Sequence, residues 1–310
     1  MSQPPEPELI EVIAADLGVN PAFVVKDWYA VRLAAVVAAT AEAAAYPVFS
    51  GGTSLSKAYG LIQRFSEDLD FKFGMPPGGL SRGQRRTFRN RIVDAVRRDG
   101  AFTLRDADVR PGDESRFFRC HVVYRDLPGA PDGLRPHLQL EVTFSAPAAA
   151  TERRPVASFV GRARREEPEI AEIACVSPVE TAADKLSALT WRVLTRQREN
   201  PDDDPTLIRH LHDLAALEAT VAGNPAFVPL FLRTADEDAG RGSPSEMLQA
   251  LTPSGRLQRL IGVLGDNAAY RAEYDRFVLS MSYARTGETP SFEAALESLG
   301  RLALLMVDPN

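Results

Sequence analysis

The sequence predicts an α/β (α+β) protein with a mixed-sheet domain over residues 1–176 and a mainly helical lobe over residues 177–310. Two observations predict this division. In the first part, helix-like segments alternate with short apolar runs that are typical of buried strands. From Ser177 the pattern is helical almost to the end of the chain. A chain of 310 residues has room for one large domain or two modest ones.

Composition and apolar spacing predict four elements in the first 63 residues. In order, they are a helix over Leu9–Leu17, a helix over Pro21–Ala45, a strand over Tyr46–Ser50 and a helix over Ser54–Gln63. The strand leads into Gly51 and Gly52, as a buried strand does when it enters a tight turn.

The next strand, Phe65–Phe73, is predicted to have one polar face. Its alternation places Ser66, Asp68 and Asp70 on one side of the strand and apolar side chains on the other. Further strands are expected over residues 117–124 and 137–144. Together these strands predict a mixed sheet.

Charge is unevenly distributed along a chain whose formal net charge is −6. The predicted helix Arg82–Arg98 holds seven arginines against a single acid, Asp94. A second basic cluster consists of Arg153, Arg154, Arg162, Arg164 and Arg165. Local basic surfaces suit a substrate that carries phosphates, because steering depends on the field at the cleft as well as on the net charge. A solvated helix face is the alternative.

The helical lobe has a well-marked start. Ser177 can cap a helix, Pro178 suits its first position, and Glu180 completes a capping box with Ser177. Along this helix, steps of three and four residues place Lys185 and Arg192 on one stripe.

Nothing in the sequence indicates export or a membrane. Residues Met1–Asp16 are acidic and lack the basic start and apolar run of a secretory signal. Residues Leu33–Phe49 are too short and too weakly apolar to span a bilayer. Cys120 and Cys175 have no metal-ligand spacing, which favours core packing in a reduced compartment. We therefore expect a cytoplasmic protein without membrane contact.

Two aspartates at positions i and i+2 on one strand face suit a site for divalent cations, and Asp68 and Asp70 have this spacing. Mg²⁺ prefers one or two protein carboxylates and fills its remaining positions with water and phosphate oxygens. Glu141 lies within an otherwise apolar strand, where an unpaired acid is costly, so it is the candidate third ligand. A solvent-facing pair of aspartates is the alternative.

The turn formed by Gly51, Gly52, Thr53 and Ser54 is a candidate phosphate site. Glycine lets the backbone approach a phosphate, and a turn that opens a helix offers backbone amides and the positive end of the helix dipole. The hydroxyls of Thr53 and Ser54 can donate to phosphates or cap the helix. A purely structural hairpin or helix cap is the alternative.

The order and separation of these motifs resemble a known family. Residues Phe49–Lys57 and Arg64–Phe71 are similar to the signature of the AbiEii/AbiGii toxin nucleotidyltransferases, which include the mycobacterial MenT-type toxins. Three further segments fit the family in order: Lys26–Tyr29, Ser177–Arg192 and Arg209–Leu214. The resemblance runs from about residue 23 to 217, and the rest of the chain matches only in its helical character.

This resemblance implies a polymerase-beta-like nucleotidyltransferase core followed by a helical lobe. It also implies Mg²⁺, a nucleoside triphosphate, transfer of a nucleoside monophosphate to RNA at the tRNA 3′ acceptor end, and a cognate antitoxin protein. The catalytic residues are then Asp68, Asp70, Lys185 and Asp213, and the metal ligands are Asp68, Asp70 and Glu141. The nucleotide-binding candidates are Gly51, Gly52, Thr53, Ser54, Lys57, Ser66 and Arg192.

Residues of the helical lobe have several possible roles. Lys185 suits a point charge for the triphosphate, and Asp213 suits either an orienter of Lys185 or a base for the incoming hydroxyl. The alternatives are a solvated Lys185 and an Asp213 that pairs with Arg209 four residues earlier. The sequence departs from the family at His210 and His212, where acidic and aromatic residues are more usual, and neither histidine has zinc spacing with a cysteine.

Ser66 shares its strand face with both aspartates. A phosphate on its hydroxyl adds about two negative charges beside the predicted metal site, which disables metal or nucleotide binding. A hydroxyl that only satisfies the strand is the alternative.

Three functions stay open at this point. The first is nucleotidyl transfer to RNA. The second keeps the chemistry but uses a protein side chain or a small molecule as acceptor. The third is a catalytically inactive nucleotide-binding module, against which the retention of both aspartates, the glycine turn and Lys185 weighs.

Overall fold

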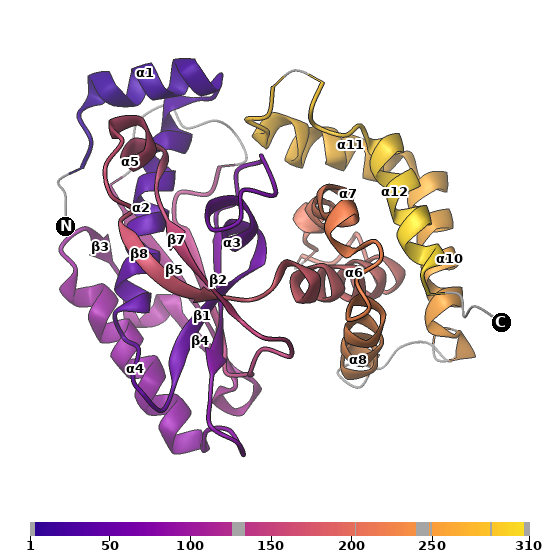
Figure 1. Ribbon diagram of the computed structural model, residues 1–310, viewed down its shortest axis with the longest axis horizontal. Helices are drawn as coiled ribbons and strands as arrows, with labels where there is room; N and C mark the ends of the chain where they lie inside the picture. Colours follow the sequence, from indigo (N-terminus) through magenta and orange to yellow (C-terminus); the bar gives the residue numbers. More distant parts are fainter. Residues whose placement is uncertain are drawn as a thin grey trace. The chain divides into compact units, whose positions relative to one another are not determined.

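The structure is a computed structural model that describes residues 4–125, 134–201, 203–239, 248, 250–285 and 287–306. Of the loop predicted around Pro128–Pro136, residues 128–133 lie outside these residues, as does the whole turn predicted near Gly240–Pro244. The chain forms two compact units, which are described separately (Figure 1). The first comprises Met1–Gly60 and Phe65–Ser177, and the second comprises Leu61–Arg64 and Pro178–Asn310.

The first unit is built on an eight-stranded mixed sheet in the described part of the chain. The strands are β1 (Tyr46–Ser50), β2 (Asp68–Gly74), β3 (Phe102–Thr103), β4 (Val109–Gly112), β5 (Phe117–Tyr124), β6 (Leu138–Thr143), β7 (Glu152–Val156) and β8 (Ile170–Cys175). Their order is β3-β5-β6-β2-β1-β8-β7, and β4 pairs with β5. Strand β2 runs parallel to β6 and β1 parallel to β8, whereas the other pairs are antiparallel. The predicted mixed sheet is therefore confirmed.

The helices of the first unit pack against the sheet or against one another. They are α1 (Pro7–Leu17), α2 (Pro21–Ala38), α3 (Gly51–Lys57), α4 (Arg82–Arg98) and α5 (Phe159–Arg164). Helices α2 and α4 contact each other on the side of the sheet that carries Leu69 and Phe73, and the ring of Phe88 in α4 lies 5.6 Å from that of Phe73 (Figure 1). Asp68 and Asp70 alternate with these buried residues, so they lie half-buried on the opposite face.

Several predicted boundaries differ from the structure. Helix α2 ends at Ala38 rather than Ala45, because the hydroxyl of Thr40 donates to the carbonyl of Val37 at 2.7 Å and the chain turns toward β1. Helix α3 begins at Gly51, directly after the strand, instead of at Ser54, and it ends at Lys57 instead of Gln63. Strand β2 begins at Asp68 instead of Phe65, because the preceding Glu67 side chain is buried in an ion pair.

The turn from β1 into α3 requires glycine at position 51. Gly51 has a φ of +72°, and a Cβ atom there lies 2.0 Å from Oδ2 of Asp70. The two residues meet because Ser50 and Asp70 are partners in the antiparallel register of β1 and β2. The missing side chain of Gly51 thus leaves the space that the Asp70 carboxylate occupies.

The long elements of the second unit are all α-helices in the described part of the chain. They are α6 (Pro178–Leu194), α7 (Arg209–Val221), α8 (Phe227–Ala239), α10 (Pro253–Asp266), α11 (Ala268–Phe277) and α12 (Phe292–Leu304), with short 3₁₀ turns at Pro205–Ile208 and Leu279–Met281. Helix α6 begins at Pro178 as predicted and contacts α7, α8 and α10. The described helices of both units include none that is long and apolar enough to cross a membrane.

A short segment before β2 also belongs to the second unit. Arg64 forms an isolated antiparallel bridge with Ser282, and the backbone amide of Tyr283 donates to the carbonyl of Gln63 at 2.9 Å. A single boundary near residue 176 does not describe this excursion of the chain.

We expect Gly51→Ala to lower the free energy of unfolding by about 3 kcal/mol, because a left-handed backbone conformation costs about 1–2 kcal/mol for alanine and the new methyl group also displaces Asp70. Gly18→Ala is the matched control, since Gly18 has a φ of +66° and a Cβ atom there meets nothing within 4 Å. Its loss is expected to be about 1 kcal/mol. Urea denaturation of both variants measures the difference, and equal losses contradict the close approach of Gly51 and Asp70.

Candidate active site

The exposed face of the sheet carries a row of polar side chains across neighbouring strands. In register, Asp70 of β2 pairs with Glu141 of β6, and Glu141 pairs with Arg119 of β5. Asp68 pairs with Gln139 and lies in the next row. Residues that pair across strands place their side chains on the same face, so the three predicted metal ligands share one surface.

Two of these acids have arginine partners. Oε1 of Glu141 accepts from Nε of Arg119 and from Nε2 of Gln139, each at 2.8 Å. Oδ1 of Asp68 accepts from Nη1 of Arg135 at 2.7 Å. Within the described residues, no group of three or more His, Cys, Asp or Glu side chains is arranged to hold a metal ion. Oε1 of Glu141 is therefore engaged by Arg119 and Gln139 in this structure.

The two aspartates alone fit a divalent cation. Mg²⁺ takes one or two protein carboxylates and completes its shell with water and phosphate oxygens. Asp68 keeps 28% of its side chain exposed, and Asp70 is half-buried, with its Oδ2 atom in the space that the absent side chain of Gly51 leaves. Asp68 and Asp70 thus present oxygen donors where other metal ligands can reach them.

A buried network supports Asp68 from within the protein. Nζ of Lys26 donates to Glu67 at 2.5 Å and to the carbonyl of Arg135 at 2.6 Å. The backbone amide of Arg135 donates to Oε2 of Glu67 at 3.1 Å. Burial lowers the pKa of Lys26, and the charge of Glu67 opposes that shift. The network fixes the backbone of Arg135, whose guanidinium group holds Asp68.

The hydroxyls of the glycine turn point into the protein. Thr53 donates to the carbonyl of Asp68 at 2.5 Å and lies 3.4 Å from the carbonyl of Ser66. Ser54 is 1% exposed and adjoins Cys175, whose pKa burial raises to about 11. The part of the turn that reaches the surface is the half-buried backbone at Gly51. Backbone groups, and not these hydroxyls, are therefore the phosphate donors that the turn can offer.

Lys57 is also directed inward. Its ammonium group forms an ion pair with Asp27 and lies 3.4 Å from the centre of the Phe159 ring. Asp27 in turn accepts from the backbone amide of Phe159 at 2.7 Å. Burial lowers the pKa of Lys57, and Asp27 opposes that shift. These contacts join α3 to α2 and α5, and they give no support to the predicted nucleotide contact of Lys57.

The second unit contains a cluster around the fully buried Asp213. Arg64 donates to both carboxylate oxygens, at 2.8 and 2.6 Å, and Nζ of Lys185 lies 2.8 Å from Oδ2. Nδ1 of His212 lies 3.1 Å from Oδ1. Burial acts to raise the pKa of Asp213, but Arg64 and Lys185 hold it well below its usual value. A carboxylate of this kind is a weak base, so the cluster supports the role of Asp213 as an orienter of Lys185.

His210 adjoins this cluster, and the charge of Arg192 acts on His210. Nδ1 of His210 lies 3.4 Å from Nζ of Lys185. Burial and the charges of Lys185 and Arg192 hold the pKa of His210 well below its usual value, so the neutral ring accepts from Lys185. Nη1 of Arg192 lies 3.7 Å from Oδ2 of Asp204, and both side chains are largely exposed. A nucleotide contact by Arg192 stays a prediction.

Several supporting residues had no predicted role. Arg64, Lys26 and Glu67 lie within the motifs that carried the family resemblance, which was the one available signal for them. Arg135 had no such signal, because it lies 67 residues from its partner Asp68. Of the four predicted catalytic residues, Asp68 and Asp70 belong to the first unit and Lys185 and Asp213 to the second.

Comparison with known proteins agrees with these features. A family profile described as nucleotidyl transferase AbiEii toxin, type IV TA system, matches residues 33–298. No curated protein matches the chain. Among solved structures, the chain is similar to MenT4, a nucleotidyltransferase toxin from Mycobacterium tuberculosis H37Rv, with a TM-score of 0.53 and 18% identity over 96% of this chain and 99% of that chain. This likeness confirms the predicted fold class. Because the profile spans most of the sequence, the chain belongs to the AbiEii family of nucleotidyltransferase toxins of type IV toxin–antitoxin systems.

Proposed function

We propose that this toxin transfers a nucleoside monophosphate from a nucleoside triphosphate to the 3′ acceptor end of tRNA and thereby blocks translation. The observation that carries the proposal is the aspartate pair on the exposed sheet face, with Oδ2 of Asp70 in the space left by Gly51. In this reaction the terminal hydroxyl oxygen of the RNA bonds to the α-phosphorus, pyrophosphate leaves, and the hydroxyl proton passes to solvent. The tRNA substrate implies a cytoplasmic site of action.

Asp68 and Asp70 are proposed to hold Mg²⁺, with Glu141 as a further ligand. The ion supplies charge stabilisation for the phosphoryl oxygens during the transfer. Arg135 keeps Asp68 in one orientation, since its own backbone is fixed by Glu67. The backbone at Gly51 is proposed to contact the phosphates.

Lys185 is proposed to bind the triphosphate, and Asp213 is proposed as its positioning residue. The salt bridge to Asp213 fixes the Lys185 ammonium group, and the neutral ring of His210 lies beside it without competing for negative charge. A type IV toxin also implies an antitoxin partner, and we propose that a cognate antitoxin protein neutralises this activity.

The central test is label transfer from each of the four radiolabelled nucleoside triphosphates to total bacterial tRNA in the presence of magnesium. We expect label in the tRNA band with the wild-type protein. Asp70→Asn is expected to reduce the rate at least about 100-fold, because it removes a charged ligand from the reacting centre. The exposed Asp16→Asn serves as the control and is expected to leave the rate unchanged.

Two outcomes contradict the proposed acceptor. Label that survives RNase but disappears with protease identifies a protein acceptor. Triphosphate binding without transfer to RNA or protein identifies a catalytically inactive module.

Two variants in the Asp213 cluster distinguish a residue that positions Lys185 from a residue that binds the triphosphate. Asp213→Asn leaves Arg64 and Lys185 without their anionic partner, so we expect the free energy of unfolding to fall by about 3–5 kcal/mol. Lys185→Met keeps the Arg64–Asp213 pair, so we expect the free energy of unfolding to fall by about 1 kcal/mol or less. The rate of label transfer should nevertheless fall at least about 100-fold. Urea denaturation measures the free energy of unfolding of each variant, and the transfer assay measures its rate of label transfer. Full transfer activity in Lys185→Met contradicts the role of Lys185.

The pKa of His210 predicts a dependence of stability on pH. Because the folded pKa lies below the ordinary value of 6.5, the unfolded chain takes up the proton first as the pH falls. Stability is therefore lost below pH 6.5, by up to about 1.4 kcal/mol per pH unit. Denaturation between pH 7.5 and about 5.5 should show a smaller loss in His210→Gln than in the wild type. Parallel curves for the two proteins contradict this assignment.

A further inference from the structure

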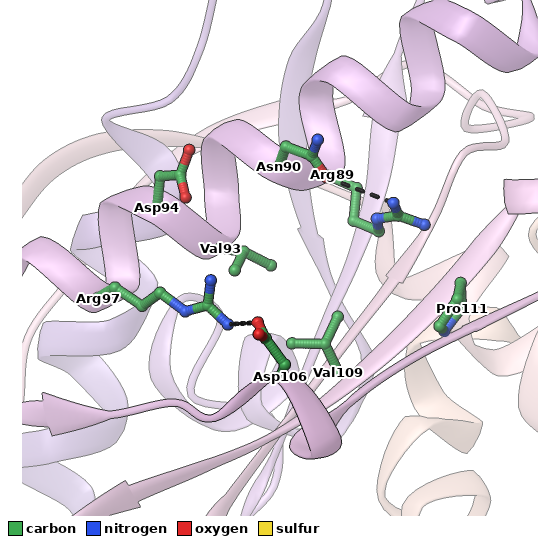
Figure 2. A pocket seen from close by; sticks show the side chains of 8 residues that line it. All are labelled: Arg89, Asn90, Val93, Asp94, Arg97, Asp106, Val109 and Pro111. Atoms are coloured by element: carbon green, nitrogen blue, oxygen red, sulfur yellow. Dashed lines mark hydrogen bonds and ion pairs between the residues drawn. The ribbon is translucent and has the colours of Figure 1, made fainter.

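A basic groove lies between α4 and the edge strand β4 in the first unit. It consists of two adjoining cavities of about 390 and 450 Å³ that share Arg89 and Pro111. We call it the α4 groove. Figure 2 shows its first half, where Val93 of the helix and Val109 of the strand lie between Arg97 and Arg89.

The charge of the groove is concentrated near the start of α4. The second cavity is lined by Arg82, Arg86 and Arg89 and by no acid. Arg82 and Arg86 are exposed, and the structure gives neither an acidic partner among the described residues. At the other end, Arg97 is neutralised by Asp106 at 2.5 Å (Figure 2).

These charges come from side chains and not from the end of the helix. The hydroxyl of Ser81 accepts from the backbone amide of Gln84, and the side chain of Gln84 accepts from the backbone amide of Ser81. This capping box leaves the arginine side chains of the groove as its donors. A guanidinium group binds phosphate through two parallel hydrogen bonds, so it suits a ligand with phosphate oxygens.

The spacing of the arginines suits a ligand whose charge repeats. Arg82 and Arg89 are seven residues apart, which corresponds to about 10 Å along the helix, with Arg86 between them. Few apolar side chains line the groove, namely Val93, Val109 and Pro111. A phosphodiester backbone fits this row of charges better than the apolar face of a peptide helix does.

Strand β4 connects the groove with the aspartate row. Val109 and Pro111 line the groove, and Arg110 between them points to the other face of the sheet. There Arg110 pairs in register with Arg119, the partner of Glu141. From Asp70 to Arg110 is three strand spacings, or about 14 Å. A backbone that leaves the groove over this edge meets Arg110 and Arg119 before it reaches the aspartates.

We propose that the α4 groove binds the phosphodiester backbone of the acceptor RNA, with Arg82, Arg86 and Arg89 as its phosphate ligands. This assignment rests on the proposed function, because it gives the RNA acceptor a surface outside the aspartate row. It gives a role to three of the seven arginines that α4 carries.

The test compares two triple variants with the same change in charge. Arg82→Gln, Arg86→Gln and Arg89→Gln are combined in the groove variant. Arg233→Gln, Arg259→Gln and Arg276→Gln are combined in the control, since these three side chains are exposed and lie in the second unit, outside both basic clusters. The probe is dye-labelled unfractionated bacterial tRNA, whose dissociation constant is measured by fluorescence anisotropy over a series of salt concentrations. Melting temperatures verify that both variants are folded.

Loss of three phosphate contacts is expected to weaken tRNA binding about tenfold or more and to flatten the slope of log K against log salt by about 2 to 3. The control should stay within about twofold of the wild type, and its slope should change by less than about 1. In the transfer assay, the KM for tRNA should rise in the groove variant while kcat at saturating tRNA is retained.

Unchanged tRNA affinity and salt slope in the groove variant overturn the inference, and the proposed function then stands if the wild-type protein labels tRNA. The converse result, weaker tRNA binding by the groove variant together with no transfer to tRNA by the wild type, supports the groove and refutes the proposed function. Normal tRNA binding combined with lost capture of the co-expressed antitoxin also overturns the inference, because it identifies the groove as a protein-binding surface.

Discussion

Two buried ion pairs from neighbouring residues of α2 organise the first unit. Lys26 binds Glu67, and Asp27 binds Lys57. A buried pair stabilises a fold only when further hydrogen bonds satisfy both charges. Here the carbonyl of Arg135 accepts from Lys26, and Asp27 accepts from a backbone amide of α5. One turn of α2 thereby fixes both the helix after the glycine turn and the approach to the aspartate strand.

A steric constraint then joins the glycine turn to the aspartates. The turn and the strand are distant in sequence, but the register of β1 and β2 brings Gly51 against Asp70. Any side chain at position 51 meets the carboxylate, whatever the chemistry of the site. Thr53 adds a second link through its hydrogen bond to the carbonyl of Asp68. The two motifs are therefore one structural unit, which gives a physical reason for them to occur together.

Local signals predicted local structure well. The predicted helix over Arg82–Arg98 and the predicted strands over Tyr46–Ser50 and residues 117–124 have the bounds of α4, β1 and β5. The arginines of the second basic cluster did not predict the elements on which they lie. Arg153 and Arg154 belong to β7, and the other three lie in α5 or directly after it. The sequence supplied residue types for the site but not the direction of their side chains. Thr53 and Lys57 face the interior because of partners on other segments, and no local pattern contains that information.

The arginine partners of the acids have a consequence for the proposed chemistry. Carboxylates that share one surface repel each other, and a positive partner lowers that cost. Arg119 and Arg135 supply it for Glu141 and Asp68. Under the proposed function, a cation that displaced these guanidinium groups would leave their paired donors available to phosphate oxygens, for which they are equally suited. The same two arginines can then stabilise the acids before the substrate binds and the phosphates afterwards, so charge stays balanced on this face in both states.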